Sequence, residues 1–492
     1  MKTSLIEKIL EQIRKINRRQ IIVFLVAMTL VVANGYSIIR EFPAIQLITV
    51  ALAGLYLVFF HADWAMYLVA FTTPFSVIIS SKNIHLGLSL PSEALMITLT
   101  LIFFARILYD LRIKREFLKH PLSIAIFVYL GWMLLTCLTS VRPVISLKFF
   151  ASKVWFITSC YWFFMQLVDD DLKNAVRYFN YYALGLAIIV VIVTYQHALS
   201  GFDEHYAHYV MSPFYNDHTA YGAALAIYLI YAITYAFIPD IKKTRKILIL
   251  VVIAVLSIAM ILSSCRAAWL SLAAALAVLL CVLFRIKFRW VFATIVVLVG
   301  LFITFQAQII DSLEHNNQDA SGDLVENIQS ITNISTDASN LERINRWQSA
   351  FRLFADRPIF GWGPGTYQFV YAPYQRAKEK TIISTNAGDG GNAHSEFIGP
   401  LAEQGFMGTI MMLAFVITVV YTGLKAYGKA KNKKAKVLVL GATLAFFSYF
   451  VHGFLNNFLD TDKLAVPIWS CAALIVVIDL YYANQEKFEE IN

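Results

Sequence analysis

Long apolar segments recur along almost the whole chain and restrict its fold more than any other feature. These runs are about 17 to 22 residues long, enough for a helix to cross a hydrocarbon core of roughly 30 Å. A backbone in lipid must satisfy its own hydrogen bonds, so the runs are expected to be helices. Only 15% of the residues are charged, against roughly 25% in soluble proteins. The sequence therefore predicts an all-α, polytopic membrane helical bundle.

Hydropathy predicts about fourteen transmembrane helices, with twelve as the alternative count. The second and third candidates are the least separated, because only the letters HADW join them. The predicted spans are about 21–39, 44–60, 64–80, 92–111, 121–138, 149–168, 176–197, 218–238, 246–263, 268–284, 290–307, 398–424, 437–455 and 464–482.

The placement of basic residues predicts the orientation of the spans. The net charge is +9, and lysine and arginine concentrate in short segments such as KREFLK, IKKTRK and KAYGKAKNKKAK. If the N-terminus is cytoplasmic, these clusters all fall on the cytoplasmic side, as the positive-inside rule requires. This distribution argues against nucleic acid as a partner. Both termini are therefore expected in the cytoplasm.

The same topology divides the chain into three parts. Residues 1–307 would hold helices 1–11, residues 308–397 a large external loop domain, and residues 398–492 helices 12–14 with a short cytoplasmic tail. A loop of that length is usually functional or a small domain. In its second half, apolar residues at helical spacing predict an amphipathic helix that ends before Pro358. These residues are Ile344, Trp347, Phe351 and Phe354.

Three arginines are candidates for binding an anion at the external face. Arg266 lies in SSCRAAW, at a tight turn between two predicted spans, and Arg343 and Arg346 lie in ERINRWQSA. Arginine suits phosphate because its planar group donates two hydrogen bonds at once. Arg266 could equally be an anchor at the membrane edge. The other two could lie on a solvated helix face, where Glu342 can pair with Arg346 at a spacing of four residues.

Two histidines and two carboxylates are further candidates on this face. Asp217 and His218 precede the eighth span, where Asp217 could simply cap the helix. His394 follows the flexible stretch GDGGN and precedes Glu396. We expect His394 to be exposed enough to titrate near the ordinary histidine pKa of about 6.5. It could act as a base that removes a proton from an acceptor hydroxyl.

Several enzyme signatures do not occur in the sequence. It has no GxxxxGK[ST], HExxH or GxSxG motif. On the external face no carboxylates are paired at metal-binding spacing, although LDTD at 459–462 is a weak acidic pair. We therefore expect no metal and no cofactor. The predicted span interiors are mostly apolar, which argues against a proton-coupled transporter.

Three motifs resemble the superfamily of bacterial O-antigen ligases and polymerases: SSCRAAWL at 263–270, ERINRWQSAFRLFADRPIFGWGPGTY at 342–367 and NAHSEFIGPLAEQGFMG at 392–408. The resemblance covers roughly residues 200–460. It implies a GT-C-like, metal-independent, inverting glycosyltransferase in the bacterial inner membrane with a periplasmic active site. The donor would be a glycan on undecaprenyl diphosphate. Arg266 and Arg343 would hold the diphosphate, and His394 would be the activating residue.

The resemblance leaves the acceptor open. A ligase would use a sugar of the lipid A core, in lipopolysaccharide biosynthesis, and a polymerase would use another lipid-linked repeat unit. Related members use a protein hydroxyl. Arg346, Asp217, His218 and Glu396 are candidates for binding substrate. From other classes of protein, a transporter of lipid-linked glycan and an inactive scaffold remain alternatives. The sequence does not give the oligomeric state.

Overall fold

The computed structural model describes most of the chain, which divides into two compact units, residues 1–65 and 66–492. In the first unit the described helix is α3 (Ala44–Phe60). The second unit carries the helical bundle and all of the candidate site residues. The described residues are 28–29, 44–81, 86–109, 114–203, 206–239, 241–287, 289–290, 293, 297, 300, 304, 338–376 and 391–482.

Nine helices in the described part of the chain are long and apolar enough to cross a membrane. The chain is therefore an all-α, polytopic membrane protein, as predicted. These helices are α5 (Ser92–Tyr109), α7 (Pro121–Leu138), α10 (Lys173–Leu199), α11 (His218–Ala236), α12 (Lys243–Leu262), α13 (Arg266–Leu283), α18 (Ile398–Lys429), α19 (Lys433–His452) and α20 (Asp462–Val477), which continues into the π-helical turn η6 (Ile478–Tyr482).

The predicted span at 64–80 is wrong. Helix α4 (Ala62–Thr72) ends there in the 3₁₀ turn η1 (Thr73–Phe75), and the chain then forms an antiparallel hairpin. Strand β1 (Val77–Ser81) pairs with β2 (Leu86–Leu90), with Val77 opposite Leu90. Pro74 lacks the N–H that a continuing helix needs, and the following Val-Ile-Ile sequence favours an extended backbone.

Two other predicted spans need comment. The prediction at 149–168 is a longer helical segment made of α8 (Pro143–Ile157), the π-helical turn η2 (Thr158–Phe163) and α9 (Phe164–Asp170). Its proline at position 143 occupies the first helical turn, where a missing N–H costs nothing. The predicted spans at 21–39 and 290–307 lie largely outside the described residues. The total number of spans therefore stays a prediction.

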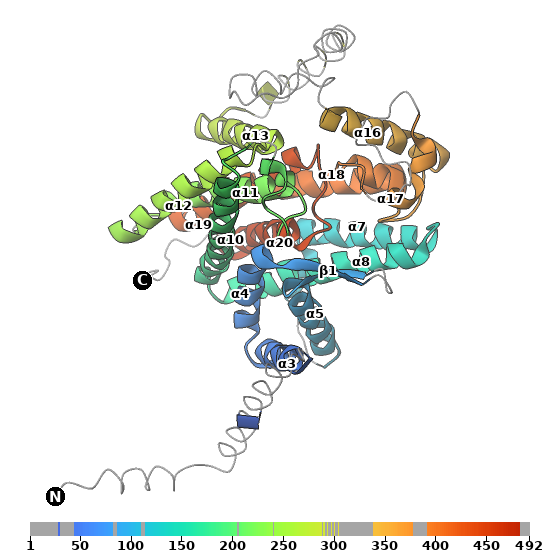
Figure 1. The fold of residues 1–492 in the computed structure, drawn as a ribbon. Coiled ribbons are helices and arrows are strands. Elements are labelled where there is room, and N and C mark those ends of the chain that lie inside the picture. The colour runs from blue at the N-terminus through green and yellow to red at the C-terminus, as the bar shows by residue number, and fades with distance from the viewer. Residues whose placement is uncertain are drawn as a thin grey trace, which may run out of the picture. The chain divides into compact units, whose positions relative to one another are not determined.

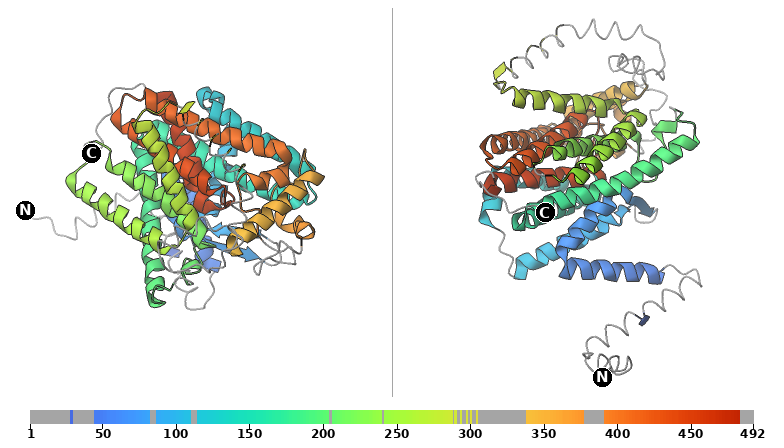
Figure 2. Two further views of the ribbon diagram at one scale, coloured as in Figure 1. Left: turned by 90° about the horizontal axis from the view of Figure 1, so that it is seen from above. Right: turned by 90° about the vertical axis from the view of Figure 1, so that its left-hand side faces the viewer.

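Helices α11, α19 and α20 form the centre of the bundle. Helix α19 packs against α11, α13, α18 and α20, and α18 also packs against α7 (Figure 1). Helices α12 and α13 lie at the edge of the bundle (Figure 2) and expose large apolar side chains such as Leu250, Ile258 and Leu276. Apolar side chains on the outside are expected where a helix faces lipid.

Helix α16 (Ala338–Asp356) confirms the amphipathic helix predicted before Pro358. The buried side of α16 is not the apolar stripe from which the helix was predicted. Asn345, Arg346 and Ser349 are buried, whereas Ile344 and Phe351 are exposed. The polar side is buried because α16 packs against α18 and finds hydrogen-bond partners in the segments on either side of it.

A small apolar core holds α16 to the start of α18. Ala350 and Leu353 of α16 pack with Tyr367 of α17 (Tyr367–Val370), with Tyr371 and with Ala402. Helix α17 leads into the 3₁₀ turn η4 (Ala372–Tyr374). These segments form a folded cap over the bundle end where α18 begins (Figure 1).

A kink in α18 gives the cap its attachment point. Gly405 has φ of +71° inside the helix. The carbonyl of Gln404 accepts a 2.9 Å hydrogen bond from Trp132 Nε1, and the N–H of Phe406 donates to the carbonyl of Pro358 at 3.0 Å. A positive φ at this position favours glycine. A Cβ at Gly405 would also lie 2.0 Å from the carbonyl oxygen of Ile359.

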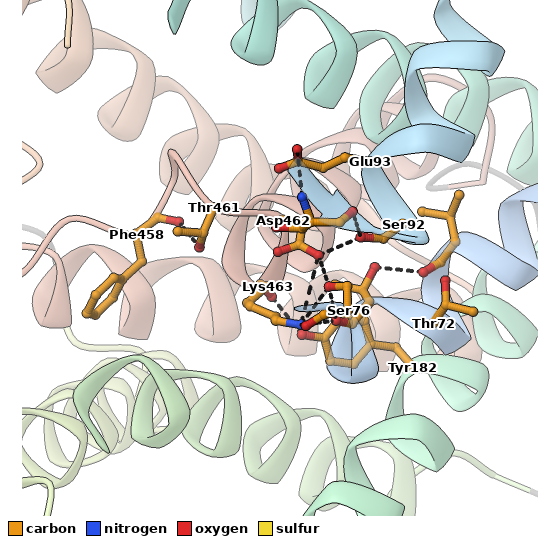
Figure 3. Close-up of polar contacts among 12 residues, drawn as sticks. Thr72, Ser76, Ser92, Glu93, Tyr182, Phe458, Thr461, Asp462 and Lys463 are labelled. Atoms are coloured by element: carbon orange, nitrogen blue, oxygen red, sulfur yellow. Dashed lines mark hydrogen bonds and ion pairs between the residues drawn. The ribbon is translucent and has the colours of Figure 1, made fainter. Parts of the chain in front are cut away.

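A buried ionic cluster ties the hairpin region to α20 (Figure 3). Lys463 Nζ donates to the carbonyl of Ser76 and to its hydroxyl, both at 2.6 Å. The Asp462 carboxylate accepts from the hydroxyls of Ser76 and of Ser92, the latter at 2.6 Å. Glu93 accepts from the backbone N–H of Ser89. Buried charges need such partners. The role of these groups is therefore structural, because they hold the segments around Ser76 and Ser92 to the start of α20.

Candidate active site

The structure brings together four segments that are far apart in the sequence. They are the start of α11 with Asp217 and His218, the start of α13 with Arg266, helix α16 with Arg343, and the loop before α18 with His394. The charge of Arg343 lowers the pKa of both histidines, and the charge of Arg266 lowers the pKa of Arg343 and of His218. The predicted convergence of these candidates on one end of the bundle is therefore what the structure shows.

Arg343 and Arg266 form a pair of like charges at this end. Burial lowers the pKa of Arg343, and the neighbouring Arg266 lowers it further, opposed by Cys265 and Asp217. Arginine nevertheless keeps its charge in proteins. Arg343 Nε donates a 3.1 Å hydrogen bond to the carbonyl of Leu455, which fixes the direction of the guanidinium. Two cations held close together favour the binding of an anion between them.

The turn that carries Arg266 is as tight as the sequence indicated. Helix α12 ends at Leu262 and α13 begins at Arg266 itself. Ser264 between them has φ of +50°. A backbone N–H at a helix start favours anions, and an arginine in the first turn adds a full positive charge.

Arg346 has a different role from Arg343. Its Nε donates to Glu342 at 2.8 Å, and both side chains are buried. The pairing at a spacing of four residues, noted from the sequence, is therefore present. Its Nη1 donates to the carbonyl of Asn392 at 3.1 Å, and its guanidinium lies over the ring of Tyr371. Arg346 thus holds the loop that carries His394.

Glu396 fixes the other end of this loop. Its Oε1 accepts hydrogen bonds from Tyr449 Oη at 2.5 Å and from the N–H groups of Phe458 and Leu459 at 2.8 and 2.9 Å. Its own N–H donates to the carbonyl of Gly453 at 2.8 Å. Glu396 was a candidate for binding substrate, and the structure shows that Oε1 is already engaged by the protein.

His394 lies between these two attachment points in a constrained backbone. Its φ is +47°, and its N–H donates to Asn392 Oδ1 at 3.0 Å. Among the described residues its imidazole makes no hydrogen bond. Burial, followed by the charges of Arg346 and Arg343, lowers the pKa of His394 to about 3.

The expectation that His394 titrates near 6.5 is therefore corrected. The physical reason is tertiary, because a half-buried imidazole beside two arginines resists taking a third positive charge. At neutral pH the ring is uncharged. It is thus in the form that can accept a proton, although its basicity is low until an anion offsets the arginines.

Asp217 caps α11, which is the structural alternative noted from the sequence. Its Oδ1 accepts from the N–H groups of Thr219 and Ala220, both at 2.8 Å. His218 is the first residue of that helix, and its Nδ1 lies 3.1 Å from His208 Nδ1. Asp217 still contributes negative charge to the site, since its charge raises the pKa of both Arg343 and His394.

Sequence reasoning missed the segment that joins α19 to α20. Its backbone carbonyl at Leu455 orients Arg343, its N–H groups bind Glu396, and Asn456 lies 3.5 Å from Thr219 of α11. The sequence signals for it were the asparagine pair and the weak acidic pair of LDTD in HGFLNNFLDTD. The segment works mainly through its backbone, and backbone contacts leave little trace in residue types.

In the described part of the chain, no group of three or more His, Cys, Asp or Glu side chains could hold a metal ion. The expectation of a reaction without a metal stays a prediction.

The fold and this group of residues define a multi-pass membrane protein with a cationic, histidine-containing site at one end of its bundle. Residues 248–413 match the family model described as O-antigen ligase. This match supports the predicted resemblance to the O-antigen ligase and polymerase superfamily. The matched segment includes Arg266, Arg343 and His394 and ends before the α19–α20 connection. None of the curated proteins compared with the chain matches it.

Proposed function

We propose that this protein is a glycosyltransferase of the O-antigen ligase type. It would move a glycan from undecaprenyl diphosphate to an acceptor hydroxyl, such as that of a lipid A core sugar. The observation that supports this proposal is the juxtaposition of Arg266 and Arg343 with the neutral imidazole of His394. The first two are suited to a diphosphate and the third to a hydroxyl proton.

In the proposed reaction, the acceptor oxygen attacks the anomeric carbon of the donor sugar as its proton passes to His394. The bond between that carbon and the diphosphate oxygen breaks, and both bonding electrons leave with the diphosphate. Attack from the side opposite the leaving group inverts the anomeric configuration. Arg266 and Arg343 would stabilise the charge that grows on the leaving oxygen. This scheme needs no metal.

The low basicity of His394 is consistent with a reaction in which the donor diphosphate binds before the proton is transferred. Arg346 and Arg343 depress its pKa as long as their charges are uncompensated. A bound diphosphate would offset those charges and raise the pKa toward the range in which a general base is effective. Donor binding would therefore prepare the base for the acceptor.

The proposal includes a location. The protein would lie in the bacterial inner membrane with both termini in the cytoplasm and the site on the periplasmic face. Residues 308–397 would be a periplasmic loop domain between helices 1–11 and 12–14. The basic cytoplasmic clusters support this topology through the positive-inside rule.

Complementation of a deletion strain tests the proposal. His394→Ala, Arg266→Ala and Arg343→Ala are each expected to abolish mature surface glycan, since a general base is worth ~10²–10⁴ in rate and one cationic donor ~10²–10³. Arg352→Ala is the matched control, because this arginine on the same helix donates to the carbonyl of Tyr374 instead. All variants must reach the membrane at the wild-type level.

The lipid-linked intermediates separate the members of the superfamily. Accumulation of long chains on the carrier would support a ligase, whereas accumulation of single repeat units would identify a polymerase. If all three variants support wild-type glycan, the site is wrong. A transporter of lipid-linked glycan or an inactive scaffold then becomes the better explanation.

A further inference from the structure

A large cavity lies beside the loop that carries His394. Its volume is about 760 Å³, within the range of roughly 300–1,000 Å³ typical of small-ligand sites. Its walls come from β2, α5, α7, α8, α17, the N-terminal half of α18 and the α19–α20 connection. From the His394 loop, Asn392, Ala393 and Ser395 line it, but His394 itself does not. The loop is thus a wall between the cavity and the arginines.

The charges along the cavity differ in kind from those beside His394. Three basic residues, Arg142, Lys148 and Lys153, are met by the carboxylates of Glu93, Glu396, Glu403 and Asp460. Lys153 is buried and donates to the carbonyl of Leu459 at 2.7 Å. A diphosphate would therefore meet several carboxylates here. The near balance of charge favours a ligand without net charge.

The remaining lining groups suit a polyhydroxylated ligand. Phe149, Trp155 and Phe369 supply aromatic surface, and Phe369 exposes 45% of its own surface. Aromatic faces pack against the C–H faces of sugar rings, while amides such as Gln368 and Asn392 can donate to and accept from sugar hydroxyls.

Several buried polar atoms in the cavity wall have no protein partner among the described residues. These atoms are Trp155 Nε1, Asn457 Oδ1 and Asp460 Oδ1. Burying such groups without a hydrogen bond costs free energy, so native proteins usually satisfy them. By contrast, Glu403 accepts from the N–H groups of Gly365 and Tyr367 and has a structural role.

We propose that this cavity binds the uncharged sugar residues of the acceptor glycan. The inference rests on the proposed function, because it takes His394 to be the base that the acceptor hydroxyl must reach. A saccharide lying between Phe369 and Asn457 would end at Asn392 and Ser395, on either side of His394. The donor diphosphate would stay on the arginine side of the loop.

Binding to the purified full-length protein in nanodiscs tests the inference without requiring turnover. The probes are lipid-free core oligosaccharides released from the source strain's lipopolysaccharide, measured by calorimetry, and undecaprenyl diphosphate, measured separately. Phe369→Ala and Asn457→Ala are each expected to weaken oligosaccharide binding about tenfold, equivalent to ~1.4 kcal/mol. Both variants should bind undecaprenyl diphosphate as wild type does.

Phe351→Ala is the matched control, because Phe351 is also an exposed aromatic, at 44%, but does not line the cavity. It should bind oligosaccharide normally. Wild-type oligosaccharide binding by both cavity variants would overturn the inference. Displacement of the oligosaccharide by undecaprenyl diphosphate in Arg343→Ala would also overturn it, since the cavity would then hold the lipid donor.

Failure of the proposed function gives a different result. If oligosaccharide binding depends on Phe369 and Asn457 while His394→Ala still supports surface glycan, the cavity binds sugar but the assigned chemistry is wrong.

Discussion

The guanidinium of Arg346 donates a 3.1 Å hydrogen bond to the carbonyl of Asn392, two residues before His394. The same group is paired with Glu342 at 2.8 Å. Glycine at position 391 makes room for it, because a Cβ there would lie 1.9 Å from Arg346 Nη1. Arg346 is therefore a positioning residue, although it resembles Arg343 in type and lies less than one turn away.

Arg346→Ala is expected to lower the free energy of unfolding by about 3–5 kcal/mol, because it removes the cation that pairs with the buried carboxylate of Glu342. Thermal unfolding of the purified protein measures this loss. Arg343→Ala should destabilise less, although it removes more of the donor affinity. The double variant Glu342→Leu/Arg346→Met should recover stability but not glycan transfer. Full transfer by this double variant would show that Arg346 does not position the loop.

The pH dependence of transfer reports the state of His394. Because its pKa is lowered to about 3, kcat/KM should show no acid limb near pH 6.5 that depends on this residue. The profile of kcat, which reports the enzyme–substrate complex, should show a higher pKa than that of kcat/KM. An acid limb in kcat/KM near pH 6.5 that Arg343→Gln shifts upward would belong to His394 and would contradict the depressed pKa.

The pH dependence of protein stability should also depend on the protonation of His394. Between about pH 3 and pH 6.5 the unfolded chain protonates His394 while the folded protein does not. The unfolded state then binds more protons, so stability falls as the pH drops below 6.5. His394→Gln should weaken this slope in chemical unfolding experiments. An unchanged slope would mean that other groups control the acid sensitivity.

Glu396 provides a test of the second attachment of the loop. Glu396→Ala should cost about 1–3 kcal/mol for each of the two buried N–H groups, of Phe458 and Leu459, that lose their acceptor. Glu396→Gln is the matched variant, because its amide oxygen can still accept from both groups and should preserve most of the stability. Equal losses in the two variants would show that the charge, rather than the acceptor, is required.

The kink in α18 predicts that alanine substitutions at two glycines of this helix have different effects on the yield of folded protein. Gly405→Ala should reduce the yield of folded protein, because a Cβ there would lie 2.0 Å from the carbonyl of Ile359 at a φ of +71°. Gly428→Ala should be neutral or stabilising, since nothing lies within 4 Å of its Cβ position. Size-exclusion chromatography of both variants measures this. Similar behaviour would mean that the kink is not required.

Much of this protein was determined by the sequence itself. Long apolar runs predict membrane helices because a backbone in lipid has few other solutions, and eight of the nine candidate spans begin within about three residues of a predicted start. The prediction at 64–80 failed because Pro74 and the β-branched residues after it decide the backbone locally, whereas hydropathy averages over them. The three arginines and His394 were found from their residue types and motifs.

Only the tertiary structure decided what these residues do. Arg343 and Arg346 are both arginines on one helix, yet Arg343 faces Arg266 while Arg346 is committed to Glu342 and Asn392. The pKa of His394 departs from the ordinary histidine value because burial and neighbouring charges come from segments distant in the chain. The α19–α20 connection organises the site through backbone groups, which every residue carries. Such contacts depend on proximity rather than residue type, so the sequence alone could not reveal them.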